Sequence, residues 1–273
     1  HRNGVALDPQ EVCKRGLPGG DVVLLRDNQH CPELDRLFRG LVQQAGDTVI
    51  NVDIREADIV ADLTTAAGRE QALAAIRARC PQGIQGFVPS AGLGPQHPSL
   101  SRIVALNFFA VRAMTEALLP MLQQGKGHAV LVASNSASLQ GINEELVQAM
   151  LANDETRASA LVEKLDGFQA YGGSKNAVVR WMRRLAPEWA KHGVRINAVA
   201  PGTTQTPLLQ AGLDDPVWGD AIRNFPVPLG GFADPQQIAS ALAFFLGSES
   251  SFCAGSVLFV DGGTDALLRP DQF

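Results

Sequence analysis

The stretch YGGSKNAVVRWMRRLAPEWAKHGVRINAVA, residues 171–200, runs from a helix-forming segment directly into a short apolar strand. The same alternation recurs along the chain, with strands expected at 21–25, 48–53, 58–63, 84–90, 128–134, 194–200 and 256–262. Helices are expected at 33–45, 66–79, 100–124, 171–192 and 234–247. The strands are continuous apolar runs, which is typical of a sheet covered on both faces. The pattern therefore predicts an α/β fold, a doubly wound, Rossmann-like parallel sheet.

Composition limits the classes of protein to which this chain can belong. With 273 residues and 45% hydrophobic content it can bury one large core, so residues 1–273 are expected to form a single domain. A net charge of −5 and a pI near 5.5 give no reason to expect a nucleic acid or a membrane as partner. The four cysteines lack metal-ligand spacing, and no apolar run reaches the ~18 residues of a membrane span. We therefore expect a cytoplasmic protein that acts on a small molecule and has no metal site.

Two segments fall outside the alternating pattern. Residues 1–20 are expected to form an N-terminal extension. Residues 139–170 carry many charges at helical spacing and no strand, which predicts an insertion of two short helices before the next long helix. This insertion could serve for packing or dimerisation, or it could form a wall of a substrate pocket, and its sequence leaves both open.

A tyrosine and a lysine stand at the head of the helix predicted from residue 171. Tyr171 and Lys175 are four residues apart, so both side chains lie on one face of the helix. A lysine ammonium beside a phenol lowers the pKa of the phenol, which can then donate or accept a proton near neutral pH. Tyr171 is the only tyrosine in the chain, and its helix follows a strand that ends in the small polar residues ASNSAS, 133–138. The pair is therefore the candidate acid/base group.

Several further motifs stand in the order found in a known family. The segments that carry this likeness are PSAGLG (89–94), ALNFFA (105–110), YGGSK (171–175), INAVAPGTTQTP (196–207) and VDGG (260–263). Together they resemble the signature segments of the short-chain dehydrogenases/reductases over about residues 48–263. The segments AGLGPQ and TPLLQAGLDDP and the tail DGGTDALLRPDQF resemble the bacterial hydroxysteroid dehydrogenase/carbonyl reductase subgroup. The resemblance implies hydride transfer between a nicotinamide and a steroid-like or other bulky apolar alcohol or ketone.

The resemblance also assigns roles to individual residues. It implies that Tyr171 is the acid and base, that Lys175 holds the nicotinamide ribose, and that Asn107 anchors a water for proton relay. Asp53 ends the strand 48–53, where a carboxylate accepts hydrogen bonds from the adenosine ribose and favours NAD, although Arg55 leaves NADP open. The other cofactor-binding residues that the matched motifs imply are Asp62, Leu63, Ala91, Gly92, Pro201, Gly202 and Thr206.

The turn after the first strand departs from the family pattern. Counted back without gaps from the second strand, NQHCPELD (28–35) falls on the glycine-rich turn of the family. Gln29, Glu33 and Asp35 replace its three glycines, so side chains fill the space where the backbone approaches a pyrophosphate. Each carboxylate would repel a phosphate by as much as roughly 4 kcal/mol at about 4 Å. We therefore expect weak or absent cofactor affinity, with Arg26 among the few donors near enough to substitute.

The position of the family's catalytic serine is also changed. Aligned by its strand, VLVASNSAS (130–138) places Asn135 there, flanked by Ser134 and Ser136. Neighbouring residues of a strand face opposite sides, so a serine enters the site only if the backbone shifts by one residue. Asn135 can donate a hydrogen bond to a carbonyl oxygen. Asn135 and a shifted Ser136 therefore stand as alternatives for the polar group of the site.

Three hypotheses follow. The first is an NAD-dependent dehydrogenase/reductase, favoured by the retained Tyr171, Lys175 and Asn107. The second is a non-redox enzyme that has lost dinucleotide binding and uses Tyr171 and Lys175 for acid/base chemistry, as the related halohydrin dehalogenases do with an arginine in place of the lysine. The third, a catalytically silent homologue, is disfavoured because a silent fold needs none of these side chains. The resemblance further implies a homo-oligomer, a dimer or tetramer, joined partly through residues 256–260.

Overall fold

The computed structural model describes residues 20–26 and 32–272, so the expected N-terminal extension lies almost wholly outside the described residues. In the described part, seven parallel strands form one sheet in the order β3-β2-β1-β4-β5-β6-β7. The strands are β1 (Asp21–Leu25), β2 (Thr48–Asp53), β3 (Ile59–Val60), β4 (Gly86–Pro89), β5 (His128–Val132), β6 (Arg195–Pro201) and β7 (Val257–Val260). The strand order reverses between β1 and β4, which is where open α/β sheets bind ligands. The predicted doubly wound parallel sheet is confirmed.

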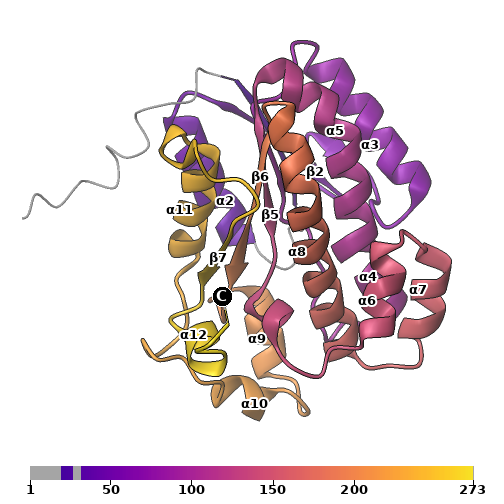
Figure 1. Cartoon of the computed structure of the whole chain (residues 1–273), viewed down its shortest axis with the longest axis vertical. Coiled ribbons are helices and arrows are strands. Elements are labelled where there is room, and N and C mark those ends of the chain that lie inside the picture. The colour runs from indigo at the N-terminus through magenta and orange to yellow at the C-terminus, as the bar shows by residue number, and fades with distance from the viewer. Residues whose placement is uncertain (1–19, 27–31, 273) are drawn as a thin grey trace, which may run out of the picture.

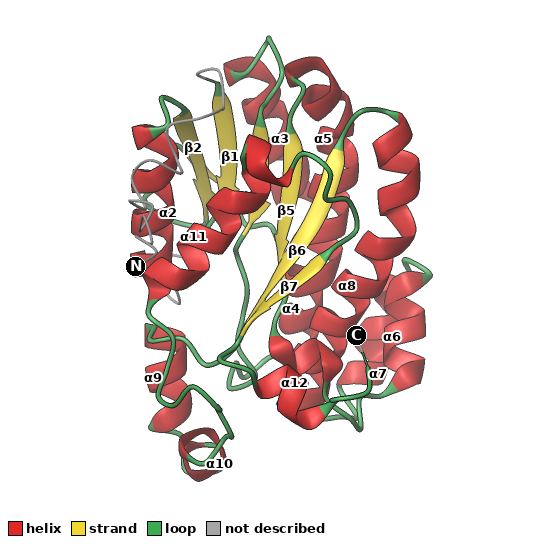
Figure 2. Ribbon diagram, turned by 60° about the vertical axis from the view of Figure 1, so that its left-hand side comes forward, coloured by secondary structure: helices red, strands yellow, loops and turns green. Residues whose placement is uncertain are grey.

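Helices cover both faces of this sheet (Figures 1 and 2). One face is covered by α2 (Pro32–Gln44) and α11 (Pro235–Leu246), and the other by α3 (Ala66–Arg79), α5 (Val111–Gly125) and α8 (Gly167–Lys191). Alternate strand residues point into the two cores. Val22 and Leu24 pack with Phe38 on the α2 side, whereas Val23 and Leu25 pack on the α8 side. Burial on both faces explains why the strands are continuous apolar runs.

The helix predicted at 100–124 contains an irregular turn. It consists of α4 (Leu100–Val104), the π-helical turn η1 (Ala105–Ala110) and α5. Such turns accommodate an extra residue within a helix and are frequent at functional sites. The turn contains Asn107, which is fully buried. By length and composition this stretch could cross a membrane, but 56% of its most apolar window is buried inside the protein, as in a core helix.

The insertion at 139–170 forms the two short helices that its sequence predicts, α6 (Glu144–Leu151) and α7 (Glu155–Val162). They pack beside α4 and α8 (Figure 1). Leu146, Met150 and Val162 are fully buried and belong to the larger core. The outer surface carries ion pairs, such as Glu145 with Arg157 at 3.0 Å. These contacts support a packing role for α6 and α7, and the role of the insertion as a wall of a substrate pocket stays a prediction.

The structure differs from the sequence-based expectations at several strand ends and loops. The strand expected at 58–63 is reduced to two residues, because the Asp62 side chain accepts hydrogen bonds from Thr64 and turns the chain toward α3. Three short helices were not predicted, since segments of five to seven residues show too little periodicity. They are α9 (Pro207–Leu213), α10 (Gly219–Arg223) and α12 (Thr264–Leu268). All three lie beyond the carboxyl ends of the strands (Figure 1).

Candidate active site

The parallel strands bring their carboxyl ends to one edge of the sheet, and most of the predicted site residues end or follow a strand there. Asp53 ends β2 and Pro201 ends β6. The others lie in the segments directly after β3, β4, β5 and β6, namely Asp62, Leu63, Ala91, Gly92, Asn135, Ser136, Gly202 and Thr206. The exceptions are Asn107, Tyr171 and Lys175, which helices supply from the α5–α8 side. The fold thus gathers residues far apart in sequence along one edge.

Tyr171 and Lys175 lie one turn apart on α8. The helix begins at Gly167, and the Asp166 side chain caps it by accepting a hydrogen bond from the Gln169 amide at 2.9 Å. The Lys175 Nζ lies 5.7 Å from the centre of the Tyr171 ring. Lys175 is 5% exposed and donates to the Val132 carbonyl at the end of β5, at 2.9 Å. A buried positive charge is therefore held beside the phenol by the backbone of the sheet.

Asn107 holds the loop that follows β4. Its Oδ1 accepts a hydrogen bond from the Leu93 amide at 2.8 Å, and its Nδ2 donates to the Leu93 carbonyl at 2.9 Å. A Cβ added at Gly92 would lie 3.3 Å from the Asn107 Oδ1 and 3.7 Å from the Lys175 Nζ. Asn107, Lys175 and the loop after β4 therefore lie close together. Because Gly92 has no side chain, the space between them stays open. Anchoring of a relay water by Asn107 stays a prediction.

The segment after β5 does not continue as a strand. β5 ends at Val132, and residues 135–138 form the 3₁₀ turn η2, which the Ser134 side chain caps by accepting from the Ser136 amide at 3.1 Å. Strand alternation therefore does not decide which side chain enters the site. The Asn135 Nδ2 and the Ser136 Oγ are both buried without a hydrogen-bond partner in the described part of the chain. Buried donors of this kind are costly unless a ligand engages them, so both residues stay candidates.

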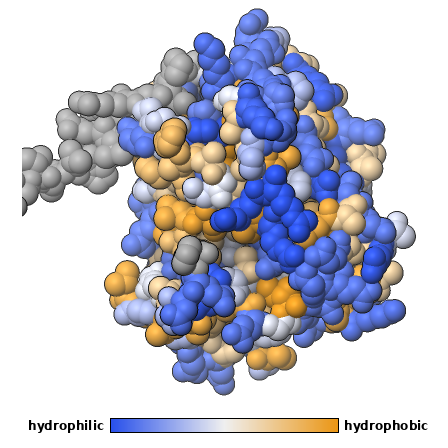
Figure 3. Space-filling view, in the orientation of Figure 1, coloured by the Kyte–Doolittle hydropathy of each residue, from blue (hydrophilic) through white to orange (hydrophobic). Residues whose placement is uncertain are grey.

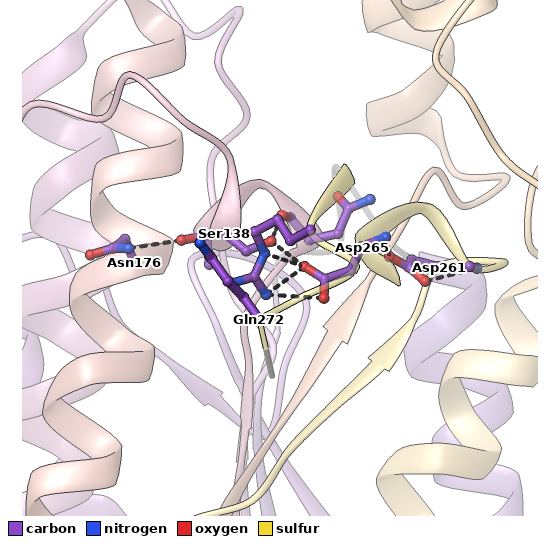
Figure 4. A network of polar contacts seen from close by, with 9 residues as sticks. Ser138, Asn176, Asp261, Asp265 and Gln272 are labelled. Atoms are coloured by element: carbon purple, nitrogen blue, oxygen red, sulfur yellow. Dashed lines mark hydrogen bonds and ion pairs between the residues drawn. The ribbon is translucent and has the colours of Figure 1, made fainter. Parts of the chain in front are cut away.

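A polar network links η2 to the C-terminal helix α12 (Figure 4). The Ser138 Oγ lies 2.9 Å from the Asn135 carbonyl and 2.5 Å from the Asp265 Oδ1. Arg269 donates to both carboxylate oxygens of Asp265, at 2.7 and 3.0 Å. The Asp265 amide donates in turn to Asp261 at the end of β7, at 2.7 Å. Sequence reasoning missed Asp265, because nothing in the pattern shows that residues 138 and 265 meet.

A pocket of about 270 Å³ lies at the carboxyl ends of β1, β2, β3 and β4. Its lining includes four of the predicted cofactor residues, Asp53, Asp62, Leu63 and Ala91, and also Arg26, Arg55, His97 and Arg102. Asp53 is 3% exposed, and its Oδ1 accepts a hydrogen bond from the Ile54 amide at 2.6 Å. Burial alone would raise the pKa of Asp62, but hydrogen bonds from Thr64 and the charge of Arg102 hold it below its usual value. Both carboxylates are therefore placed as hydrogen-bond acceptors.

Arg26 is the residue that directly follows β1, and its side chain is 13% exposed. Its Nε lies 3.7 Å from the Asp53 Oδ2 and 3.9 Å from the Asp35 Oδ2. Asp35, which is 4% exposed, also accepts a hydrogen bond from the Ser90 Oγ at 3.0 Å. Arg26 therefore joins the ends of β1 and β2 to the first turn of α2.

The two carboxylates expected to repel a phosphate have different surroundings. Glu33 is 57% exposed and pairs with Arg36 at 3.6 Å on the surface of α2. Asp35 instead faces Arg26, so a positive charge offsets its own. Gln29 and the rest of residues 27–31 lie outside the described residues. The expected repulsion from Asp35 is therefore reduced by a charge already in contact with it.

The groups around the pocket fit a dinucleotide. Carboxylates stand where ribose hydroxyls can donate to them, and the buried Arg26 Nε has no hydrogen bond to any described residue. Within the described part of the chain, no three His, Cys, Asp or Glu side chains are grouped so as to hold a metal. A parallel sheet with a tyrosine–lysine pair on one helix and a polar pocket at the carboxyl ends of its strands is the arrangement of a dinucleotide-dependent α/β enzyme.

Comparisons with known proteins agree with this class. A family model described as enoyl-(acyl carrier protein) reductase matches residues 156–265. A 3-alpha-hydroxysteroid dehydrogenase/carbonyl reductase of Comamonas testosteroni is 42% identical over 240 residues, 86% of this chain and 93% of that protein. A galactitol 2-dehydrogenase (L-tagatose-forming) of Cereibacter sphaeroides is 30% identical over 272 residues, 96% of this chain and 91% of that one. The crystal structure of a 3-alpha-hydroxysteroid dehydrogenase from Pseudomonas sp. B-0831 complexed with NADH superposes with a TM-score of 0.88 at 43% identity, covering 92% of this chain and 100% of that one.

The chain belongs to the short-chain dehydrogenase/reductase family. It is an oxidoreductase of that type, and its cofactor is a nicotinamide dinucleotide. The non-redox alternative has no support among these relatives. The resemblance found in the sequence motifs is thereby confirmed.

Proposed function

We propose that the enzyme transfers a hydride between NAD(H) and the carbonyl or secondary alcohol carbon of a steroid-like or other bulky apolar substrate. The observation that carries this proposal is the placement of Tyr171 and Lys175 at the same sheet edge as the pocket lined by Asp53 and Asp62. When bound, the nicotinamide supplies or accepts the hydride. The identity of 42% to a hydroxysteroid dehydrogenase/carbonyl reductase supports the substrate class.

The side chains of this chain move the proton and orient the substrate. In reduction, the Tyr171 hydroxyl donates its proton to the substrate oxygen, and in oxidation it takes that proton back. The Lys175 ammonium stabilises negative charge on the phenol. The Asn135 Nδ2, buried without a partner among the described residues, is the donor that polarises the substrate oxygen, with the Ser136 Oγ as its alternative.

Apolar side chains near the site suit a bulky apolar substrate. Ile142 packs beside Gly172 and Gly173 in the turn of α8 that follows Tyr171. Leu208 of α9 lies against Gly94 in the loop after β4, where an added Cβ would come within 2.4 Å of it. These contacts place Ile142 and Leu208 near the carboxyl edge, where an apolar substrate would be stabilised by leaving water.

Asp53 supports NAD as the preferred dinucleotide, because a carboxylate at the end of β2 accepts hydrogen bonds from both hydroxyls of the adenosine ribose. A phosphate on that ribose would meet its negative charge. Arg55 lines the same pocket and is exposed, so NADP is expected to bind more weakly and still measurably.

The proposal is tested by following reduced cofactor in a reaction with a 3α-hydroxysteroid and either NAD or NADP. A small polyol such as galactitol serves as the matched polar substrate. We expect turnover of the steroid with NAD at a higher kcat/KM than with NADP, and little turnover of the polyol. A higher kcat/KM for the polyol would contradict an apolar substrate. Turnover with NADP but not with NAD would contradict NAD as the cofactor.

We further propose that the enzyme is a homo-oligomer associated through α11, β7 and α12. Apolar side chains are exposed along these elements, as Figure 3 shows for the face on which they lie. The exposed residues are Phe244, Phe252, Leu258, Leu267 and Leu268. Apolar patches of this kind mark association surfaces. Light scattering at micromolar protein is expected to give a dimer or tetramer, and Leu258→Arg is expected to dissociate it, whereas a monomeric natural protein would refute the proposal.

A further inference from the structure

Arg26 directly follows β1, two residues before the segment that the sequence comparison aligned with the glycine-rich turn of the family, and the proposed reaction gives it no role. It lines the pocket together with Asp53 and Arg55. We infer that the Arg26 guanidinium binds a phosphate group on the adenosine half of the dinucleotide, an inference that rests on the proposed function. A side chain thereby replaces the backbone amides that a glycine turn would direct at the phosphate.

The hydrogen-bonding capacity of Arg26 supports this inference. Its Nε is buried and makes no hydrogen bond with any described residue. The oxygens of Asp35 and Asp53 lie 3.9 and 3.7 Å away, which is beyond hydrogen-bond length. The guanidinium has five N–H donors in a fork that matches phosphate oxygens. It therefore has donors to offer a ligand in the pocket.

The two carboxylates orient the guanidinium. Asp35 and Asp53 approach it from different elements, α2 and β2, and both are nearly fully buried. An arginine held in this way loses less side-chain freedom when it binds a ligand than an exposed one does. The lining of the pocket contains three arginines, Arg26, Arg55 and Arg102, and two aspartates, and Asp35 beside Arg26 offsets part of that positive charge. A phosphate is the group that such a lining accommodates.

The chain offers a matched control in Arg36. This residue lies on α2, where its side chain is 71% exposed and pairs with Glu33 at the surface. It does not line the pocket. Arg36→Gln removes the same charge as Arg26→Gln from a nearby place on the molecule. Any general electrostatic effect of the lost charge will appear in both variants, whereas a direct contact with phosphate will appear only in Arg26→Gln.

The inference is tested by calorimetric titration of the natural protein, Arg26→Gln and Arg36→Gln with NADH, ADP, 2′-AMP and adenosine. We expect Arg26→Gln to weaken NADH binding by about tenfold or more, the scale of a lost charged hydrogen bond, and to leave adenosine binding nearly unchanged. Loss confined to ADP assigns Arg26 to the pyrophosphate, and loss confined to 2′-AMP assigns it to a ribose phosphate. Equal losses in Arg36→Gln, or equal loss of adenosine, would overturn the inference.

A double variant separates binding from charge balance. Arg26→Gln leaves Asp35 without its positive neighbour, which could by itself repel a phosphate or loosen the fold. Arg26→Gln/Asp35→Asn restores the local net charge, and the asparagine can still accept from Ser90. We expect the affinity of the double variant for ADP and NADH to remain as low as that of Arg26→Gln. Recovery of affinity there would show that Arg26 only neutralises Asp35.

The outcomes distinguish this inference from the function on which it rests. If the natural protein binds NADH and Arg26→Gln binds it equally well, the inference is wrong and the proposed function stands. If the natural protein binds neither NADH nor NADPH, the proposed function fails. In that case ADP binding that depends on Arg26 would still support a phosphate site, and its absence would remove that site as well.

Discussion

The candidate site has two ends along the carboxyl edge of the sheet, and they are built in different ways. At the proposed catalytic end, side chains are fixed by backbone groups, since Lys175 donates to the Val132 carbonyl and Asn107 bonds twice to Leu93. At the adenosine end, a side-chain ion cluster of Arg26, Asp35 and Asp53 lies at the carboxyl ends of β1 and β2. Proton transfer tolerates only small displacements of the reacting groups, whereas many arrangements of donors can hold a phosphate. We therefore expect substitutions at the proposed catalytic end to cost more activity than substitutions at the cofactor end.

The largest effect is expected for Tyr171→Phe, which deletes one oxygen and leaves packing nearly intact. Loss of the proton donor should lower kcat by ~10²-fold or more, the scale of general acid/base catalysis. The affinity for NADH should not change, because the adenosine end is untouched. Turnover is measured by reduced cofactor and affinity by calorimetry. Full activity in this variant would place the chemistry elsewhere, and lost affinity would show that the two ends are not independent.

Asn107→Ala tests how firmly the catalytic end is anchored. It leaves the buried amide and carbonyl of Leu93 without their partners. Each unsatisfied buried group costs roughly 1–3 kcal/mol, so the free energy of unfolding should fall by about 2 kcal/mol or more. Denaturant titration measures it. Asn176→Ala is the control and should cost less, because it removes one bond to the Ala137 carbonyl and a long, partly exposed contact with Arg180 at 3.5 Å. Equal costs would contradict a special anchoring role of Asn107.

Asp265→Asn tests whether the C-terminal helix positions the turn that carries Asn135. The change weakens the contacts of residue 265 with Arg269 and Ser138, and we expect stability to fall by about 1 kcal/mol. We also expect kcat to fall several-fold with cofactor affinity unchanged. Asp220→Asn is the control, since it breaks an exposed pair with Arg223 and should change neither quantity. A purely structural role would lower stability and leave kcat as it was.

The smallest effect concerns His128, at the amino end of β5 and away from both ends of the candidate site. Burial, followed by the charge of Arg195, lowers the pKa of His128 from 6.5 to about 4. The unfolded chain therefore binds a proton at a higher pH than the folded protein, and stability is lost as the pH falls from about 6.5 toward 4. Allowing for partial exposure, the loss is about 1–2 kcal/mol.

His128→Gln should flatten this part of the profile of unfolding free energy against pH. His192→Gln removes an exposed histidine and should leave the profile unchanged. If His128→Gln has the same profile as the natural protein, another group is responsible for the loss of stability in this pH range. Cofactor affinity should be the same in both variants, since neither residue lines the pocket.

Local patterns in the sequence were enough to predict the sheet, the long helices and the inserted pair of helices. The boundaries of β1, β2 and α3 agree with the predicted ranges, because apolar runs and the cap at Thr65 mark them locally. The retained motifs also placed Tyr171, Asp53 and Asp62 at one edge.

Contacts between distant parts of the chain could not be predicted in this way. The strand expected at 128–134 ends at Val132 and the turn η2 begins at Asn135, so strand alternation does not apply there. The Ser138–Asp265 contact joins positions 127 residues apart. Asp35 looked like a repulsive charge because its sequence neighbours do not reveal that Arg26 faces it. These features depend on tertiary packing and have no periodic signal.

The most direct measurement follows the hydride itself. The protein is incubated with a 3-oxosteroid and NADH that carries deuterium at the transferred position of the nicotinamide, and the product is analysed by mass spectrometry. With the natural protein we expect an alcohol product that carries one deuterium on the former carbonyl carbon. With Tyr171→Phe we expect very little of this product. A protein that binds NADH and forms the alcohol without deuterium from either face of the nicotinamide, or forms no alcohol from any apolar ketone, would contradict hydride transfer at this site.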